Sequence, residues 1–274
     1  MTATSRVGRD GRLMLGFERR GERTVLARCR STLPLQVLAP VALDDPAAIV
    51  SVLNPTGGLV GGDTLVIEVD AAPGAHACLT TPSATRVYRT ASEATLQHVA
   101  LRVASGAQLE WVPDHTIPYA GAALRQAIEA DVADGATCVI VDAFAAGRVA
   151  RGERWRFALL DATLSARDAR GRLLHDRFIL DSAAPRGLGI TDGRPYFATI
   201  AVVADAGIDA FIDRVTELDA GGAADVAAGR LPRRGAIARC LAADAPALGD
   251  VVDAVWAAAR CEVLKVPPLR LRKT

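Results

Sequence analysis

The sequence of 274 residues lacks the features that would place it among nucleic-acid-binding, secreted or membrane-spanning proteins. Its 32 basic and 31 acidic side chains nearly cancel, so no broad field attracts nucleic acid or anionic lipid. No uncharged apolar run reaches the roughly 18 residues that a membrane-spanning helix needs. The segment from Met1 to Asp10 has no apolar run after its arginines and does not resemble a signal peptide. We therefore expect neither a nucleic-acid partner nor a membrane.

Cysteine is scarce and irregularly spaced. The five cysteines are odd in number, and no two of them have C-x-x-C spacing. In a chain without a secretion signal such residues are expected to be reduced thiols in the core, and the expected location is cytoplasmic. They are Cys29, Cys78, Cys138, Cys240 and Cys261.

What the sequence does contain is typical of a folded globular protein. Half of the residues are apolar and 23% are charged. A chain of this length buries a sizeable core without disulfides or metals. No long linker divides it, so we predict a single domain over residues 1–274. It should be mainly β over residues 1–200 and mixed, with two helices, over residues 201–274.

Alternating hydrophobicity predicts β-strands in the first two-thirds of the chain. In residues 64–70, Leu65, Ile67 and Val69 alternate with a second set that includes Glu68 and Asp70, which places one face on the core. Residues 138–141 are uniformly apolar, as in a strand covered on both faces. Further strands are expected at residues 12–19, 24–30, 95–103, 155–159 and 177–180.

Three Gly-Ala pairs recur at the ends of predicted strands. Gly74-Ala75, Gly106-Ala107 and Gly135-Ala136 stand about 30 residues apart. This spacing predicts stacked coils of a solenoid-like sheet, although glycine turns of any other all-β protein would give the same pattern.

Helical spacing of apolar residues occurs only in the last third. It covers residues 208–218, before Gly221-Gly222, and residues 248–259, with a strand expected between them at residues 237–241. Pro267-Pro268 prevents continuation of the second helix. The basic tail from Leu269 to Thr274 is expected to be exposed.

Residues 54–63 read Asn-Pro-Thr-Gly-Gly-Leu-Val-Gly-Gly-Asp. Backbone N–H groups of a glycine-rich loop can bind phosphate. A P-loop, however, requires Gly-Lys-Ser/Thr before a helix, whereas Gly62 is followed by Asp63 and a strand. The segment therefore predicts a tight double turn, in which glycine provides positive φ or close backbone approach.

Two further segments carry no catalytic signature. Residues 79–90 combine hydroxyl side chains with Arg86 and Arg89, which are able to bind an anion or to order a loop. Ser83 does not stand in Gly-x-Ser-x-Gly and has no local base. Residues 109–122 contain a tryptophan, a tyrosine and two prolines. They suit a rigid packed loop and a partner-binding surface equally well.

The histidines give no fixed metal site. His98, His115, His175 and His76 show neither H-x-x-x-H nor H-E-x-x-H spacing. His76 and Cys78 share one face of a strand, which permits joint ligation. A buried thiol beside a histidine at the rim is the alternative.

The three segments, in this order, resemble the UreD family of urease accessory proteins, called UreH in some organisms. The family has a block like N-P-x-G-G-x-V-G-G-D, which residues 54–63 match. A block like T-T-x-A/S-A/G-T-K/R-x-Y-R matches residues 80–89, and one like L-E-W-L-P-x-x-x-I-x-x-x-G-A matches residues 109–122. Weaker similarity extends through Gly147-Arg148 to Pro267-Pro268, so it covers nearly the whole chain.

This resemblance implies a mainly β fold of stacked strands and a function without catalytic turnover. Family members assist nickel insertion into apo-urease in a complex with the accessory proteins UreF and UreG, and higher-order assembly through UreF is possible. UreG is the GTPase. A water-filled passage through the UreD-like subunit has been proposed as the route of nickel. No stably bound cofactor is expected, and nickel would be present only transiently.

The resemblance also suggests which residues carry the function. Asp63 and Glu110 are candidates for the passage, because nickel accepts oxygen ligands and transit needs weak ones; alternatively, Asp63 caps a turn. His115 departs from the family pattern and is a candidate substitute ligand. The tail lacks the Arg-Ile-Trp ending common in bacterial relatives. The residues that match the three blocks as structural or partner motifs are Asn54, Gly57, Gly58, Gly61, Gly62, Thr80, Thr81, Arg86, Tyr88, Arg89, Trp111, Pro113 and Gly121.

Two other functions stay open at this point. A β-solenoid hydrolase would use two carboxylates roughly 5 to 10 Å apart in a cleft. A plain interaction module without a metal role predicts that urease matures normally when Asp63 or Glu110 is replaced.

Overall fold

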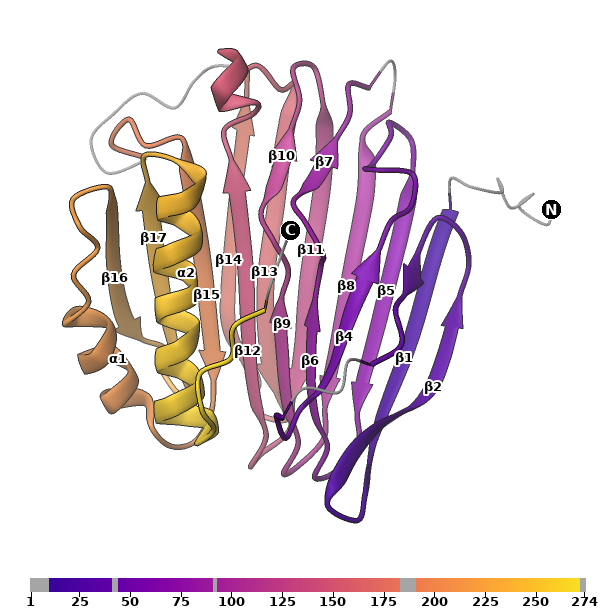
Figure 1. The fold of residues 1–274 in the computed structure, drawn as a ribbon, viewed down its shortest axis with the longest axis vertical. Helices are drawn as coiled ribbons and strands as arrows, with labels where there is room; N and C mark the ends of the chain where they lie inside the picture. The colour runs from indigo at the N-terminus through magenta and orange to yellow at the C-terminus, as the bar shows by residue number, and fades with distance from the viewer. Residues whose placement is uncertain (1–9, 41–43, 91–92, 183–190, 272–274) are drawn as a thin grey trace.

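The structure is a computed structural model that describes residues 10–40, 44–90, 93–182 and 191–271. Most elements are strands, which form two large sheets (Figure 1). The seven-stranded sheet contains β1 (Asp10–Arg20), β2 (Arg23–Ser31), β5 (Thr64–Ala71), β8 (Thr95–Val103), β11 (Ala123–Val132), β13 (Leu159–Asp168) and β14 (Gly171–Asp181). The ten-stranded sheet contains β3 (Gln36–Val37), β4 (Ala48–Leu53), β6 (His76–Thr80), β9 (Gln108–Val112), β12 (Thr137–Ala145), β15 (Tyr196–Val203), β16 (Ala224–Arg230) and β17 (Ala236–Ala242), joined by β7 (Thr85–Val87) and β10 (Thr116–Pro118).

The chain winds between the two sheets in stacked coils. Strands β5, β8, β11 and β13 pair in parallel in one sheet, and β4, β6, β9 and β12 pair in parallel in the other. Each coil therefore adds one strand to each sheet, directly beside the strands of the preceding coil. This arrangement confirms the predicted solenoid-like stacking.

The Gly-Ala pairs are the corners that return the chain to the ten-stranded sheet. Their glycines have φ values of 72°, 72° and 75°, and the following alanines are buried. The corners also bond to one another, because the N–H of Gly106 donates to the carbonyl of Gly135 at 3.2 Å. The sequence spacing of these pairs thus reflects the length of one coil.

The main core lies between the sheets. Leu65, Ile67 and Val69 of β5 point into it and are buried, as the alternation predicts. Strand β12 is buried on both faces, which confirms the interpretation of its apolar run. Its Ile140 packs between the sheets, whereas Val139 packs in a second core beneath the helices.

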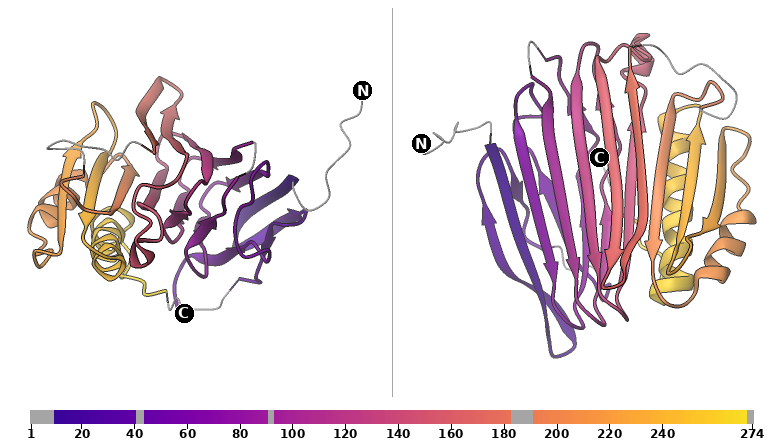
Figure 2. Two further views of the ribbon diagram at one scale, coloured as in Figure 1. Left: turned by 90° about the horizontal axis from the view of Figure 1, so that it is seen from above. Right: turned by 180° about the vertical axis from the view of Figure 1, so that it is seen from behind.

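Both described α-helices cover the outer face of the ten-stranded sheet (Figures 1 and 2). They are α1 (Ile208–Thr216) and α2 (Ala245–Ala259), close to the predicted ranges. The Asp244 carboxylate caps α2 by accepting from the N–H of Ala247 at 2.9 Å. A π-helical turn, η2 (Arg260–Leu264), continues α2. Within the described residues, no helix is long and apolar enough to cross a membrane.

The prediction that all five cysteines lie in the core is wrong, because Cys29 and Cys261 are exposed. Two predictions of local structure are also wrong. The strand expected at residues 155–159 begins only at Leu159, and Trp155 lies in a turn with φ of 58°. The tail is not fully exposed either, because Leu269 and Leu271 pack against the second core. In both segments tertiary packing decides the conformation, so the local apolar pattern is a poor guide.

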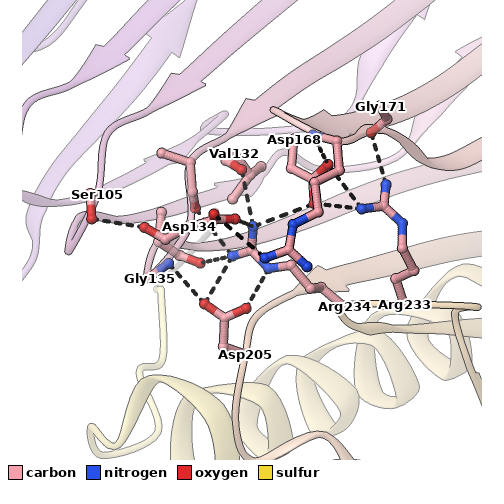
Figure 3. Close-up of polar contacts among 12 residues, drawn as sticks. Ser105, Val132, Asp134, Gly135, Asp168, Gly171, Asp205, Arg233 and Arg234 are labelled. Carbon is pink, nitrogen blue, oxygen red and sulfur yellow. Dashed lines mark hydrogen bonds and ion pairs between the residues drawn. The ribbon is translucent and has the colours of Figure 1, made fainter.

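Two adjacent arginines fasten the C-terminal hairpin to the corners of the solenoid (Figure 3). Arg233 donates to both carboxylate oxygens of Asp168, at 3.1 and 2.9 Å, and the side chain of Asp168 is only 1% exposed. Arg234 donates to the carbonyls of Val132 and Ala133, at 3.2 and 3.1 Å. The β16–β17 turn is therefore held against two corners that precede it by about 60 to 100 residues.

Candidate functional site: a cavity beneath the motif-bearing turns

The three sequence motifs occupy equivalent positions in successive coils. Each follows a strand of the ten-stranded sheet and leads to a strand of the seven-stranded sheet. Strands β7 and β10 pair in parallel, and Leu59 forms a parallel bridge with Val87. We call this third side of the solenoid the short face, consisting of residues 54–63, 81–90, 113–122 and 146–158. Its strands β7 and β10 lie toward the top of Figure 1.

The glycine-rich block is a tight turn held by Asn54. The Asn54 amide donates to the carbonyl of Gly58 at 3.0 Å, and its oxygen accepts from the N–H of Thr56 at 3.1 Å. Gly57 has φ of 82°. A Cβ on Gly58 would lie 2.6 Å from the carbonyl oxygen of Arg86 in the next coil. The predicted use of glycine for positive φ and close backbone approach is confirmed.

Replacing Gly58 by alanine is therefore expected to lower the free energy of unfolding by about 1–3 kcal/mol, because one coil must move away from the next. Urea unfolding of the purified chain would measure the loss. Gly249 is a matched control, since it lies exposed in α2 with no atom near an added Cβ. Gly249→Ala should raise stability by up to about 1 kcal/mol, and equal effects of the two substitutions would contradict the packing argument.

Asp63 caps the end of the same turn. Its carboxylate accepts from the N–H of Val60 at 2.8 Å, and the residue is only 4% exposed. Thr95 in the next coil donates to the carbonyl of Val60 at 2.8 Å. These contacts agree with the capping interpretation of Asp63. Its part in a nickel path stays a prediction.

A cavity of about 160 Å³ lies between the sheets beneath the short face. The indole N–H of Trp111 is buried there and donates to no described residue. A buried donor of this kind indicates that water or another acceptor occupies the space, and the volume holds several waters. All three motifs contribute to the lining, through Asn54, Gly57, Gly58, Thr81, Arg86, Trp111 and Pro113.

Asp142 provides a carboxylate deep in this cavity. It lies on β12 and accepts at 2.7 Å from the side-chain amide of Gln126 on β11, across the core. Burial raises the pKa of Asp142 to about 7. The negative charge of Asp176 also raises this pKa, whereas the hydrogen bond from Gln126 lowers it. A carboxylate that ionises near neutral pH inside a cavity is suited to meet a cation.

Sequence reasoning missed Asp142, although a signal was present. The residue follows directly on the uniformly apolar run 138–141. An acid within a strand that is covered on both faces is buried by necessity, and buried acids in cavities are candidates for function.

Glu110 lies on the other side of the ten-stranded sheet. Its neighbours Leu109 and Trp111 face the main core, so Glu110 points toward the helices. Glu110 is fully buried. Its carboxylate accepts hydrogen bonds from the guanidinium of Arg260 and from the indole N–H of Trp256, both at 2.6 Å. The ring of His76 lies 2.7 Å from the same carboxylate. Arg260 also pairs with Asp45. The contacts give Glu110 a structural part, and its nickel-path role stays a prediction.

The histidines that the sequence singled out lie apart. His76 and Cys78 share one face of β6, as predicted, but His76 is buried rather than at the rim. His115 lies on the short face, with its ring 2.9 Å from the carboxylate of Asp114. Within the described residues, no group of three or more His, Cys, Asp and Glu side chains could hold a metal ion. His115 as a substitute ligand stays a prediction.

The remaining motif residues stabilise the short face. Thr81 accepts from the N–H of Asp114 at 2.8 Å, and Thr80 donates to the carbonyl of Val112 at 2.9 Å. Their contacts run from one coil to the next. The motif residues outside the cavity lining are Gly61, Gly62, Thr80, Tyr88, Arg89 and Gly121.

Fold and site together define a parallel β-solenoid with helices on one face and a small cavity with a buried carboxyl group, Asp142, beneath its short face. The profile of the family described as UreD urease accessory protein matches residues 9–274. The urease accessory protein UreD of Deinococcus radiodurans is 34% identical over 269 residues, covering 97% of this chain and 95% of the relative. The UreD proteins of Alkalilimnicola ehrlichii and Cupriavidus pinatubonensis are 32% and 33% identical, cover 95% and 96% of this chain, and are covered over 89% and 93% of their own lengths.

The chain belongs to the UreD family of urease accessory proteins. Its role therefore lies in urease maturation. The match to the family covers residues 9–274 and so includes the whole solenoid.

Proposed function

We propose that the protein is a cytoplasmic, non-enzymatic scaffold that supports nickel insertion into apo-urease, in a complex with UreF and UreG. Its membership of the UreD family carries this proposal. GTP hydrolysis belongs to UreG, since the glycine-rich turn lacks the Gly-Lys-Ser/Thr of a P-loop. Nickel is cargo rather than a resident cofactor.

The cavity beneath the short face is our proposed segment of the nickel route. The observation that supports it is the buried pair of Asp142 and Gln126, which line a space large enough for several waters. One carboxylate offers a cation weak, reversible binding. A complete cage of ligands would hold the ion and stop its transfer.

The scaffold proposal predicts that deletion of this gene from a cell expressing urease and its other accessory proteins yields inactive, nickel-poor urease. Restoring the gene should recover both activity and metal content. The measurements are urease activity and nickel per purified urease, under limiting and excess nickel. Normal maturation without the gene under limiting nickel would refute the proposal, and GTP hydrolysis by the purified chain alone would refute the division of labour with UreG.

A further inference from the structure

The short face is rich in arginine, above all in its last segment, residues 146–158. Residues 146–158 contain four arginines and one glutamate. Of these four, only Arg148 pairs with a described acid, Glu153. Five arginines of the short face are exposed and form no ion pair with another described residue: Arg86, Arg89, Arg151, Arg154 and Arg156.

Contacts between coils bring these arginines onto one surface. Gly121 donates its N–H to the carbonyl of Arg156 at 2.8 Å, and Thr90 donates its N–H to Gly121 at 3.2 Å. The Arg89 side chain lies against Gly121, 3.1 Å from the position of a Cβ. Segments that are about 65 residues apart in sequence are therefore neighbours on this face.

Aromatic rings line the same surface. Tyr88 and Tyr119 meet edge to face, with ring centroids 5.3 Å apart. The guanidinium of Arg148 lies over the Tyr119 ring, 4.3 Å from its centroid. Tyrosine and arginine are, with tryptophan, enriched among the residues that dominate the binding energy of protein interfaces.

The charge of the short face contrasts with the rest of the molecule. The whole chain has a net charge of only +1. Residues 205–259, which include both α-helices, contain nine acidic and five basic side chains. The short face and the helical segment therefore carry net charges of opposite sign, and such a difference orients an approaching partner.

We propose that the short face docks a protein partner through a surface rich in aspartate and glutamate. Arginine pairs with carboxylates through two parallel hydrogen bonds, which specifies the partner's geometry as well as its charge. This inference rests on the proposed scaffold function. It adds which surface of the scaffold is used and what chemistry the partner presents.

The test compares two variants with the same change of charge. Arg151→Glu/Arg154→Glu reverses the short face, whereas Arg23→Glu/Arg30→Glu reverses two exposed arginines of β2 that form no ion pair with a described residue. The probes are the purified urease apoprotein and purified UreF of the same organism, with binding measured at low and moderate salt. A duplex DNA of about 20 base pairs serves as a third probe.

We expect the short-face variant to lose at least about tenfold in affinity for one protein probe, while the β2 variant binds like the wild type. Binding of that probe should weaken steeply as salt rises. Wild-type affinity of the short-face variant for both protein probes would overturn the inference and leave the scaffold proposal intact. Specific loss of duplex DNA binding instead would overturn it in favour of a nucleic-acid face.

Two controls separate the possible failures. Thermal unfolding must show that both variants are folded, because exposed substitutions change stability by only about 0.5 kcal/mol. Failure of the wild-type chain to bind either the urease apoprotein or UreF would contradict the scaffold function itself, and the docking inference would fall with it.

Discussion

Replacing Arg260 by methionine is expected to lower the free energy of unfolding by about 3–5 kcal/mol, the largest effect that we predict for a single side chain. Arg260 is fully buried between two carboxylates, Glu110 and Asp45, and its Nε donates to the carbonyl of Pro267 at 2.9 Å. Its removal leaves two negative charges in the interior without their cation. The tail after η2 would lose its attachment at the same time.

The size of this effect should depend on Glu110. The double variant Arg260→Met/Glu110→Gln removes the buried cation and one of its two anions together. Its loss of unfolding free energy should therefore be smaller than the sum of the losses in the two single variants. Urea unfolding of the four proteins would give the coupling energy. Additive effects would show that Glu110 and Arg260 act independently.

Arg270 provides the control for Arg260. It is an exposed arginine of the same C-terminal segment, and no described residue pairs with it. Arg270→Met should change the free energy of unfolding by no more than about 0.5 kcal/mol. A loss below about 1 kcal/mol for Arg260→Met would show that the buried cluster is not a determinant of stability.

Those parts of the fold that the sequence predicts correctly are governed by local rules. The alternation of apolar and polar residues in β5 arises because one face of the strand packs on the core. The glycines at the corners are needed because the backbone there has positive φ. Both signals lie within a few residues. They suffice for strands such as β5 and β12 and for the two helices, and the regular spacing of the corners predicts the solenoid-like stacking.

The short face is not predictable in this way. Strands β7 and β10 have three residues each, too few to show a period. That the three motifs are equivalent turns follows only from pairing between coils, such as Thr116 with Thr85. Sequence resemblance groups these motifs as a family signature without indicating that they stack.

The candidate residues show the same limit. The alternation of β9 places Glu110 opposite Leu109 and Trp111, but its partner Arg260 is 150 positions later. Asp142 and Gln126 meet because two strands of different sheets face each other across the core. No spacing rule connects such residues, so a cavity lined by them is visible only in the folded chain.

Replacing Asp142 by asparagine is expected to stabilise the protein at neutral and alkaline pH. The pKa of this carboxyl rises from 3.8 in the unfolded chain to about 7 in the folded one, chiefly through burial. The folded state thus holds the proton more tightly, and the ionisable group costs stability progressively as pH rises from about 4 to about 7. Above that range the cost is constant, about 1–4 kcal/mol.

Urea unfolding at several pH values would test this dependence. The advantage of Asp142→Asn should be absent near pH 4, grow through pH 6 and level off above pH 7, since asparagine keeps the acceptor for Gln126 without a charge. Asp131→Asn is the control, because that carboxylate is 49% exposed on the outer face of β11. A difference between Asp142→Asn and wild type that does not change with pH would contradict the buried ionisation.

The same substitution separates stability from function. If nickel passes through the cavity, removing the Asp142 carboxylate should lower the nickel content of urease several-fold under limiting nickel. This loss should occur even though the Asp142→Asn variant is more stable than the wild type. Groups retained at a cost to stability are characteristic of functional sites. An Asp142→Asn protein that is stabilised and still supports full nickel loading would place the route of the ion elsewhere, and Asp142 would then be a structural acid.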